Sequence, residues 1–381
     1  MIYLDYNATT PIDPDVVEAM LPYLREHFGN PSSGHRFGVE TRNAVEKARE
    51  QLAELLGCRS QEVVFTGGGS ESDNLAIKGI AYTCKGKGNH IITSKIEHPA
   101  VSNTCKFLER NGYTVSYLPV DACGMVQTDD VRNAIRKETI LITIMHANNE
   151  VGTIQPLKEI GELARDKRII FHTDAAQSAG KIPVSVKELN IDLLTVAGHK
   201  FYAPKGVGAL YIRNGINIEP LIHGAQHEEG RRAGTENVAG IVGLGRAAEI
   251  ASFSMEKTYS LVLDLRDRLY KNLIENIEDV KLNGHPHKRL PNTLNLSFRG
   301  VDGAALLKHV EEVAASLGSA CHDKTRELSP VLQAMGVGED FGFGAIRFSL
   351  GKWNTAVEID RTVEIFKRKV EEMRKGKESR I

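Results

Sequence analysis

Short apolar segments rich in β-branched residues alternate along the chain with helix-like segments. The short segments cover residues 63–65, 90–93, 113–118, 140–144, 169–172 and 193–196. This alternation predicts an α/β fold in which helices cover a mainly parallel sheet. Ligands of such sheets bind beyond the carboxyl ends of the strands, so we expect the functional residues there.

A second, smaller unit is predicted after a long helical stretch over residues 238–277. Residues 293–298 and 345–350 alternate in the manner of strands with one buried face, which favours a compact α+β domain. The length of 381 residues suits two domains. We therefore predict an N-terminal segment (1–15) that packs with the small domain, a large domain (16–257) and a small C-terminal domain (258–381).

The charge balance excludes some classes of partner. Charged residues make up 25% of the chain and the formal net charge is −1, so no basic field would hold a nucleic acid or an anionic membrane. No run approaches the 18 apolar residues of a membrane helix, and residues 1–5 do not resemble a signal peptide. We expect a cytoplasmic protein that binds small molecules and protein partners.

The cysteines are five in number and dispersed: Cys58, Cys84, Cys105, Cys123 and Cys321. They form no Cys-x-x-Cys pair, so we predict neither a metal site nor a disulfide scaffold. Only Cys321 has neighbours that suggest a reactive thiol. His322, Lys324 and Arg326 favour its reactive thiolate, whereas Asp323 opposes them.

Lys200 follows an apolar strand and opens a loop that contains Pro204 and Gly206. Burial near positive groups would lower the pKa of its amine and leave a neutral nucleophile. Such an amine can form a Schiff base, for which pyridoxal 5'-phosphate (PLP) is the usual aldehyde. The alternative is a solvated surface lysine.

A glycine run, residues 67–69, precedes Ser70 and a helix-like segment. Glycines allow close approach of the backbone, and a helix N-terminus offers N–H groups and a positive dipole end, so the run predicts a phosphate cradle. The alternative is that Ser70 and Asp73 only cap the helix.

Three polar residues follow other predicted strands: Asp174, His98 and Asn149. The carboxylate of Asp174 could bond a protonated pyridine nitrogen, or it could cap a helix. His98 could stack on a planar ring or move protons, although a lone histidine is more often structural. Asn149 has a similar loop position and the same two interpretations.

These segments together resemble the cysteine desulfurases, which are PLP enzymes of the class V aminotransferase group. The resemblance includes residues 3–10, 29–33 and 347–351 and covers nearly the whole chain. It implies a PLP-dependent transferase of fold type I, with PLP bound in the large domain of a homodimer. It also strengthens the functional interpretation of each of the candidate residues above.

The resemblance also implies a role for each matching residue around the cofactor ring. Lys200 would form the internal aldimine, and His98 would stack on the ring. Asp174 would meet the pyridine nitrogen and Gln177 the ring oxygen. Asn149 would line the site beside the substrate.

Phosphate and substrate contacts follow from the same resemblance. Gly69, Ser70 and His199 of one subunit would hold the phosphate, together with Thr235 of the other subunit. Arg347 would clamp the substrate carboxylate, for which its planar guanidinium is suited. On the residue alone, Arg347 is equally a structural ion-pair partner.

One position departs from the family pattern. Desulfurases usually have a phosphate-binding serine two residues before the His-Lys pair, and this chain has Ala197. We expect the missing hydrogen bond to weaken cofactor retention by about 1 kcal/mol.

The implied reaction converts L-cysteine to L-alanine and leaves a persulfide on Cys321, in a loop of the small domain. The sulfur would pass to an acceptor protein such as an iron–sulfur scaffold, or serve another sulfur transfer. A selenocysteine lyase acting on L-selenocysteine is the alternative, because some lyases share the Cys321-His322 pair. A non-catalytic scaffold of the same fold is less favoured, since the catalytic residue types are retained.

Overall fold

The computed structural model describes residues 1–317 and 327–378. Its main sheet has seven strands in the order β2 (Val63–Thr66), β8 (Gly208–Ile212), β7 (Leu193–Ala197), β6 (Ile170–Asp174), β5 (Thr139–Thr143), β3 (His90–Ser94) and β4 (Thr114–Leu118). Strand β8 runs antiparallel to both of its neighbours, and the other pairs are parallel. The predicted mainly parallel α/β sheet is confirmed, and the carboxyl ends of six strands share one edge.

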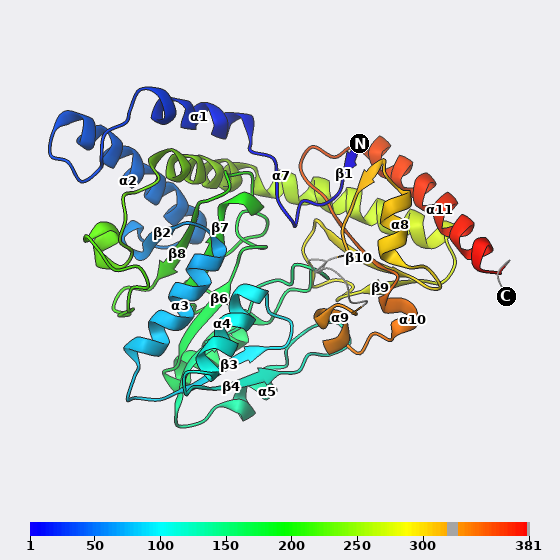
Figure 1. Ribbon diagram of the computed structural model, residues 1–381, viewed down its shortest axis with the longest axis horizontal. Helices are drawn as coiled ribbons and strands as arrows, with labels where there is room; N and C mark the ends of the chain where they lie inside the picture. The colour runs from blue at the N-terminus through cyan, green and yellow to red at the C-terminus, as the bar shows by residue number, and fades with distance from the viewer. Residues whose placement is uncertain (318–326, 379–381) are drawn as a thin grey trace.

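Helices cover both faces of this sheet, as Figure 1 shows. They are α1 (Pro14–Arg25), α2 (Arg36–Leu56), α3 (Gly69–Thr83), α4 (Pro99–Glu109), α5 (Thr128–Ala134) and α6 (Leu157–Lys167). Successive strand residues enter different cores: Leu193 packs with residues of α3 and α4, whereas Leu194 packs with residues of α2 and α6. Burial on both faces explains why these strands read as short continuous apolar runs.

The smaller unit contains an antiparallel sheet in the order β12 (Ala345–Ser349), β10 (Thr293–Phe298) and β9 (Val280–Asn283). Its helices are α8 (Gly303–His309), α9 (Pro330–Ala334), α10 (Glu339–Gly342) and α11 (Ala356–Glu378). Phe348 and Phe366 pack edge to face in its core, with ring centroids 4.9 Å apart.

One helix, α7 (Val238–Asn276), belongs to both units (Figure 1). It packs against α1 and α2 at one end and against α11 at the other, and the predicted boundary at residue 257 lies inside it. Among the described residues, α7 is the helix whose length and apolar composition would suit a membrane span. Half of that apolar stretch is buried inside the protein.

The N-terminal segment connects the smaller unit to the edge of the large sheet. Strand β1 (Ile2–Tyr3) pairs with β11 (Val313–Ala314). The backbone N–H of Asn7 then donates to Ser349 Oγ at 2.9 Å, and the N–H of Thr10 donates to the carbonyl of His199 at 2.9 Å. Residues 7–9 are thereby held over the loop that carries Lys200.

Candidate active site

A cleft of about 1120 Å³ lies at the carboxyl edge of the large sheet. The loops that follow β2, β3, β5, β6 and β7 form it together with β12 and residues 7–9. The predicted site residues that line it are Gly69, Ser70, His98, Asn149, Asp174, Gln177, His199, Lys200 and Arg347. The structure thus brings together most of the residues singled out in the sequence.

Lys200 ends the short 3-10 helix η2 (Gly198–Lys200), which follows β7 directly. Its Nζ donates to the carbonyls of Asn7 at 2.7 Å and Ala8 at 2.8 Å. The pKa of the amine is lowered to about 8, first by burial and next by the positive charge of Arg347, while carboxylates oppose the shift. A substantial fraction of the amine is therefore neutral near physiological pH.

Tyr202 fixes the backbone just beyond the lysine. Its φ of 71° lies in the left-handed region, which costs a residue with a side chain about 1–2 kcal/mol. Its N–H donates to Thr10 Oγ1 at 2.8 Å, and its hydroxyl accepts from the N–H of Lys352 at 2.9 Å. These bonds from two distant segments hold the conformation and, with it, the position of Lys200.

The glycine run after β2 forms a narrow cradle at one end of the cleft. Gly68 has φ 146°, which side chains rarely adopt, and α3 begins after it. A Cβ on Gly69 would lie 3.2 Å from the Ala197 methyl group. The first-turn N–H groups of a helix lack intrahelical partners, so they are available to an anion. Since Gly68 occupies the N-cap position without a side-chain cap, the interpretation of Ser70 and Asp73 as capping residues is wrong.

His199 lies beside this cradle. Its Nδ1 is 3.2 Å from Thr9 Oγ1. Burial lowers the pKa of the imidazole to about 4, and the charge of Lys200 adds to the effect. The ring is therefore neutral at pH 7 and offers one N–H donor to a ligand in the cleft.

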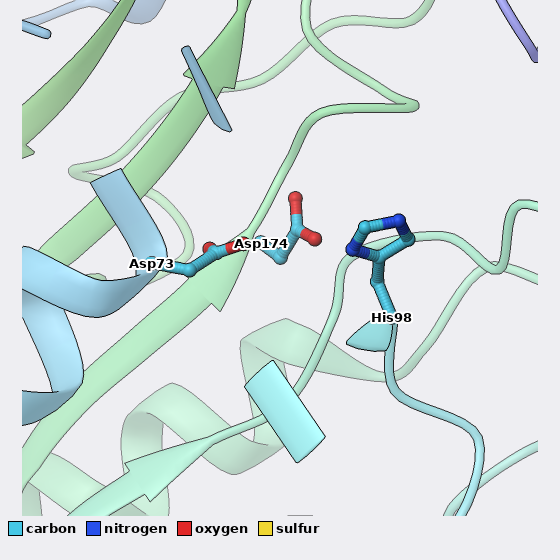
Figure 2. Close-up of side chains that lie close together, drawn as sticks. All are labelled: Asp73, His98 and Asp174. Atoms are coloured by element: carbon cyan, nitrogen blue, oxygen red, sulfur yellow. The ribbon is translucent and has the colours of Figure 1, made fainter. Parts of the chain in front are cut away.

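Asp174 and His98 form a different part of the cleft. The Oδ1 of Asp174, at the end of β6, accepts from the N–H of Ala176 at 2.8 Å. Residues 176–181 form turns, so the helix-capping interpretation of Asp174 is wrong. Burial raises the pKa of the Asp174 carboxyl, whereas His98 and Lys200 lower it. Figure 2 shows Asp174 between Asp73 and the ring of His98.

His98 has both a structural and a site position. It precedes α4, and its Nδ1 accepts from the N–H of Ala100 at 3.2 Å. Its ring is accessible from the cleft. Neighbouring residues still exclude part of its hydration, which lowers the pKa of the imidazole. The ring can therefore present a neutral face to a planar ligand.

A polar network below the lysine was not predicted from the sequence. Gln177 Nε2 donates to the carbonyl of Asn7 at 2.9 Å, and its Oε1 accepts from Lys181 Nζ at 2.8 Å. Burial lowers the pKa of Lys181 well below its usual value, and the charges of Lys200 and Arg347 lower it further. Asn7 belongs to the motif of residues 3–10, and that motif was the available signal.

Arg347 lies on β12 and is buried. Its Nη2 is 2.7 Å from Asp5 Oδ1, and its Nη1 donates to the carbonyl of Asn149 at 3.0 Å. The guanidinium thus already contacts one carboxylate at the edge of the cleft.

One predicted residue in the described part of the chain is not brought into this cleft. Thr235 is exposed and lines a separate cavity of about 110 Å³ beside Gly67 and Gly206, beyond the short helix η3 (His227–Gly230). Cys321 lies outside the described residues. The four described cysteines are free thiols.

Comparisons with known proteins agree with the family resemblance and with the fold. The family model of class-V aminotransferases matches residues 2–362. A protein named cysteine desulfurase IscS from Dictyoglomus turgidum is 52% identical over 98% of this chain and 95% of its own length. A protein of the same name from Methanosarcina thermophila is 52% identical over 98% of this chain and 93% of its own.

Solved structures give the same result. A NifS-like protein superimposes with a TM-score of 0.91 and 39% identity, covering 96% of this chain and 98% of that protein. A structure described as SspA in complex with cysteine has a TM-score of 0.82 and 40% identity, covering 93% of this chain and 100% of the other. These values indicate a shared fold over nearly the entire chain.

Proposed function

Because the chain belongs to the class-V aminotransferase family, we propose that it is a PLP-dependent cysteine desulfurase that converts L-cysteine to L-alanine and passes on the sulfur. The predicted family, fold type and cofactor are confirmed. The observation that carries the activity is the similarity, over nearly the full length, to relatives that bear the name cysteine desulfurase.

The cleft residues fit PLP. The cradle at Gly69 and Ser70 suits the phosphate, since a Cβ at residue 69 would crowd Ala197. Asp174 offers a buried carboxylate to the ring nitrogen, and Lys200 offers an amine of lowered pKa. When bound, PLP withdraws electrons from the Cα of an attached amino acid. We assign the carboxylate of Asp174 to that ring rather than to a metal ion, because the family uses PLP.

Substrate binding, proton transfer and stacking on the ring are assigned to residues of this chain. We assign the substrate carboxylate to Arg347, whose guanidinium already faces one carboxylate, that of Asp5. Asn149 lies beside Arg347, because its backbone carbonyl accepts a hydrogen bond from the guanidinium. The neutral amine of Lys200 accepts the substrate Cα proton and later returns a proton to that carbon. His98 covers one face of the ring.

The sulfur step is assigned to Cys321 from the family resemblance. Its thiolate attacks the substrate sulfur, forming an S–S bond as the substrate C–S bond breaks, which leaves a persulfide on the protein and alanine after protonation. We propose that the persulfide serves an iron–sulfur scaffold or another acceptor protein. We also propose a homodimer in which Thr235 reaches the phosphate site of the partner, because Thr235 lies outside the cleft of its own chain.

Alanine release distinguishes the candidate activities. The PLP-loaded protein is given L-cysteine or L-selenocysteine in parallel, with a reducing thiol present, and alanine is quantified. We expect comparable turnover of the two substrates. Release confined to L-selenocysteine would instead identify a selenocysteine lyase, the alternative suggested by the Cys321-His322 pair. Absence of alanine with both substrates would favour the non-catalytic scaffold.

Ala197→Ser should strengthen cofactor binding. Ala197 lines the cleft beside Gly69, so a serine hydroxyl there can add a hydrogen bond to the phosphate. One such bond contributes about 1 kcal/mol, which corresponds to a roughly fivefold lower dissociation constant. Titration of the cofactor-free protein with PLP measures this dissociation constant. Pyridoxal without its phosphate is the control ligand, and an equal gain for both ligands would contradict the assignment of residue 197 to the phosphate.

A further inference from the structure

Asp73 is a buried carboxyl beside Asp174 that none of the steps above uses. It comes from α3, whereas Asp174 ends β6. One oxygen of each carboxyl and one nitrogen of His98 all lie within 4.8 Å of one another (Figure 2). Asp73 is 1% exposed, and its Oδ1 has no hydrogen-bond partner among the described residues.

Two buried carboxylates at this spacing repel each other, so one of them retains a proton. The surroundings decide which one. Asp174 faces the amine of Lys200 and the ring of His98, and it accepts the N–H of Ala176. These groups favour the charged form of Asp174.

The groups that face Asp73 do not stabilise a negative charge to a comparable extent. The nearest ring is that of His172, whose Nε2 is 3.7 Å from Asp73 Oδ1. Burial lowers the pKa of His172 to about 3, so this imidazole is neutral at pH 7. The pKa of the Asp73 carboxyl is raised well above its usual value by burial and by Asp174, and the hydroxyl of Thr195 opposes the shift only in part.

The remaining titratable neighbours do not alter this assignment. Glu97, on the loop after β3, adds to the repulsion when it is charged, but burial raises its own pKa to about 8. The ring of His98 has a pKa lowered by burial. At neutral pH Glu97 is therefore largely uncharged, so its repulsion of Asp73 is weak.

We propose that Asp73 is a positioning residue that remains uncharged beside Asp174, so that Asp174 alone of the pair carries the negative charge offered to the cofactor ring. This inference rests on the proposed function, because it concerns the residue assigned to the ring nitrogen. An uncharged Asp73 also keeps an O–H group that can donate to the neighbouring Asp174 carboxylate. A side chain of the same shape without a donor could not do so.

The test compares Asp73→Asn with Asp73→Ala. Asparagine is neutral, similar in shape and still a donor, so Asp73→Asn should retain the PLP dissociation constant and the pH midpoint of the bound cofactor's absorption band. Asp73→Ala removes the donor and leaves space beside Asp174, and we expect PLP binding to weaken by about tenfold with a shifted midpoint. Asp129→Asn, on the exposed surface of α5, is the matched carboxyl-to-amide control.

Three results would overturn the proposal. The first is a midpoint in Asp73→Asn displaced as far as in Asp73→Ala, since the charge of Asp73 would then matter. The second is wild-type behaviour of Asp73→Ala. The third is an infrared spectrum of Asp73→Asn that retains the protonated-carboxyl band assigned to Asp73 in the wild type, and this measurement serves even if Asp73→Ala does not fold. Failure of the wild-type protein to show any bound-cofactor band would instead refute the proposed function.

Discussion

Replacing Lys200 with alanine should abolish the covalent attachment of PLP to the chain and lower alanine release by about 10³-fold or more, the scale expected for losing a positioned proton acceptor. The neutral amine is the reactive form, and its pKa is lowered to about 8. Attachment of PLP to the cofactor-free wild type should therefore accelerate as the pH rises and level off above about 8. Borohydride trapping followed by mass spectrometry measures attachment.

Lys158→Ala is the control for this experiment, because Lys158 is an exposed lysine on α6 that does not line the cleft. It should retain both attachment and turnover. If Lys200→Ala still yielded a trapped adduct on another lysine together with full turnover, the assignment of Lys200 would be wrong. Lys181 is the residue to inspect in that case, because its amine is also buried and has a strongly lowered pKa.

Cys321→Ala should leave the PLP dissociation constant unchanged and eliminate the persulfide. The thiolate is the only assigned acceptor of the substrate sulfur, whereas none of the assigned cofactor contacts involves residue 321. Persulfide on the protein is measured by differential alkylation and mass spectrometry after a single exposure to L-cysteine. Sulfur transfer to a reducing thiol should fall by at least about 10²-fold, the lower end of losing a catalytic group.

Cys123→Ala provides the matched cysteine control. Cys123 is a free, partly buried thiol, and its pKa is raised by burial and by Asp121, so it is a weak nucleophile. This variant should transfer sulfur at the wild-type rate. Undiminished sulfur transfer by Cys321→Ala would refute the nucleophile assignment, and a persulfide found on Cys123 would indicate where the sulfur goes.

The periodic parts of the fold were predictable from the sequence. The helix expected over residues 238–277 is α7 (Val238–Asn276), and the apolar run at residues 193–196 is β7 (Leu193–Ala197). Both are buried elements whose apolar pattern reflects local burial. The pairing of β1 with β11 was not predicted, because it joins two-residue segments more than 300 residues apart through backbone bonds.

The site was predictable wherever a side chain carries a recognisable chemical type in a family motif. Lys200, Asp174 and His98 are such residues, and the structure places them in one cleft. The position of Asp73 was misread as a helix cap, since its burial arises from β6 packing against α3 and not from its neighbours in the chain. Asn7 contacts Lys200 and Gln177 through its carbonyl oxygen, which any residue type would supply.

The route of the N-terminal segment has a consequence for biosynthesis. Residues 7 and 8, whose carbonyls accept from the Lys200 amine, are translated before the strands of the large sheet. Their anchor at Ser349 is translated more than 300 residues later. Domains generally fold as units during synthesis, the N-terminal part first, but here the large sheet can form while Lys200 still lacks these two carbonyls. A nascent chain therefore completes the cleft only after Ser349 has been translated, which keeps shorter chains from presenting all of the residues around Lys200.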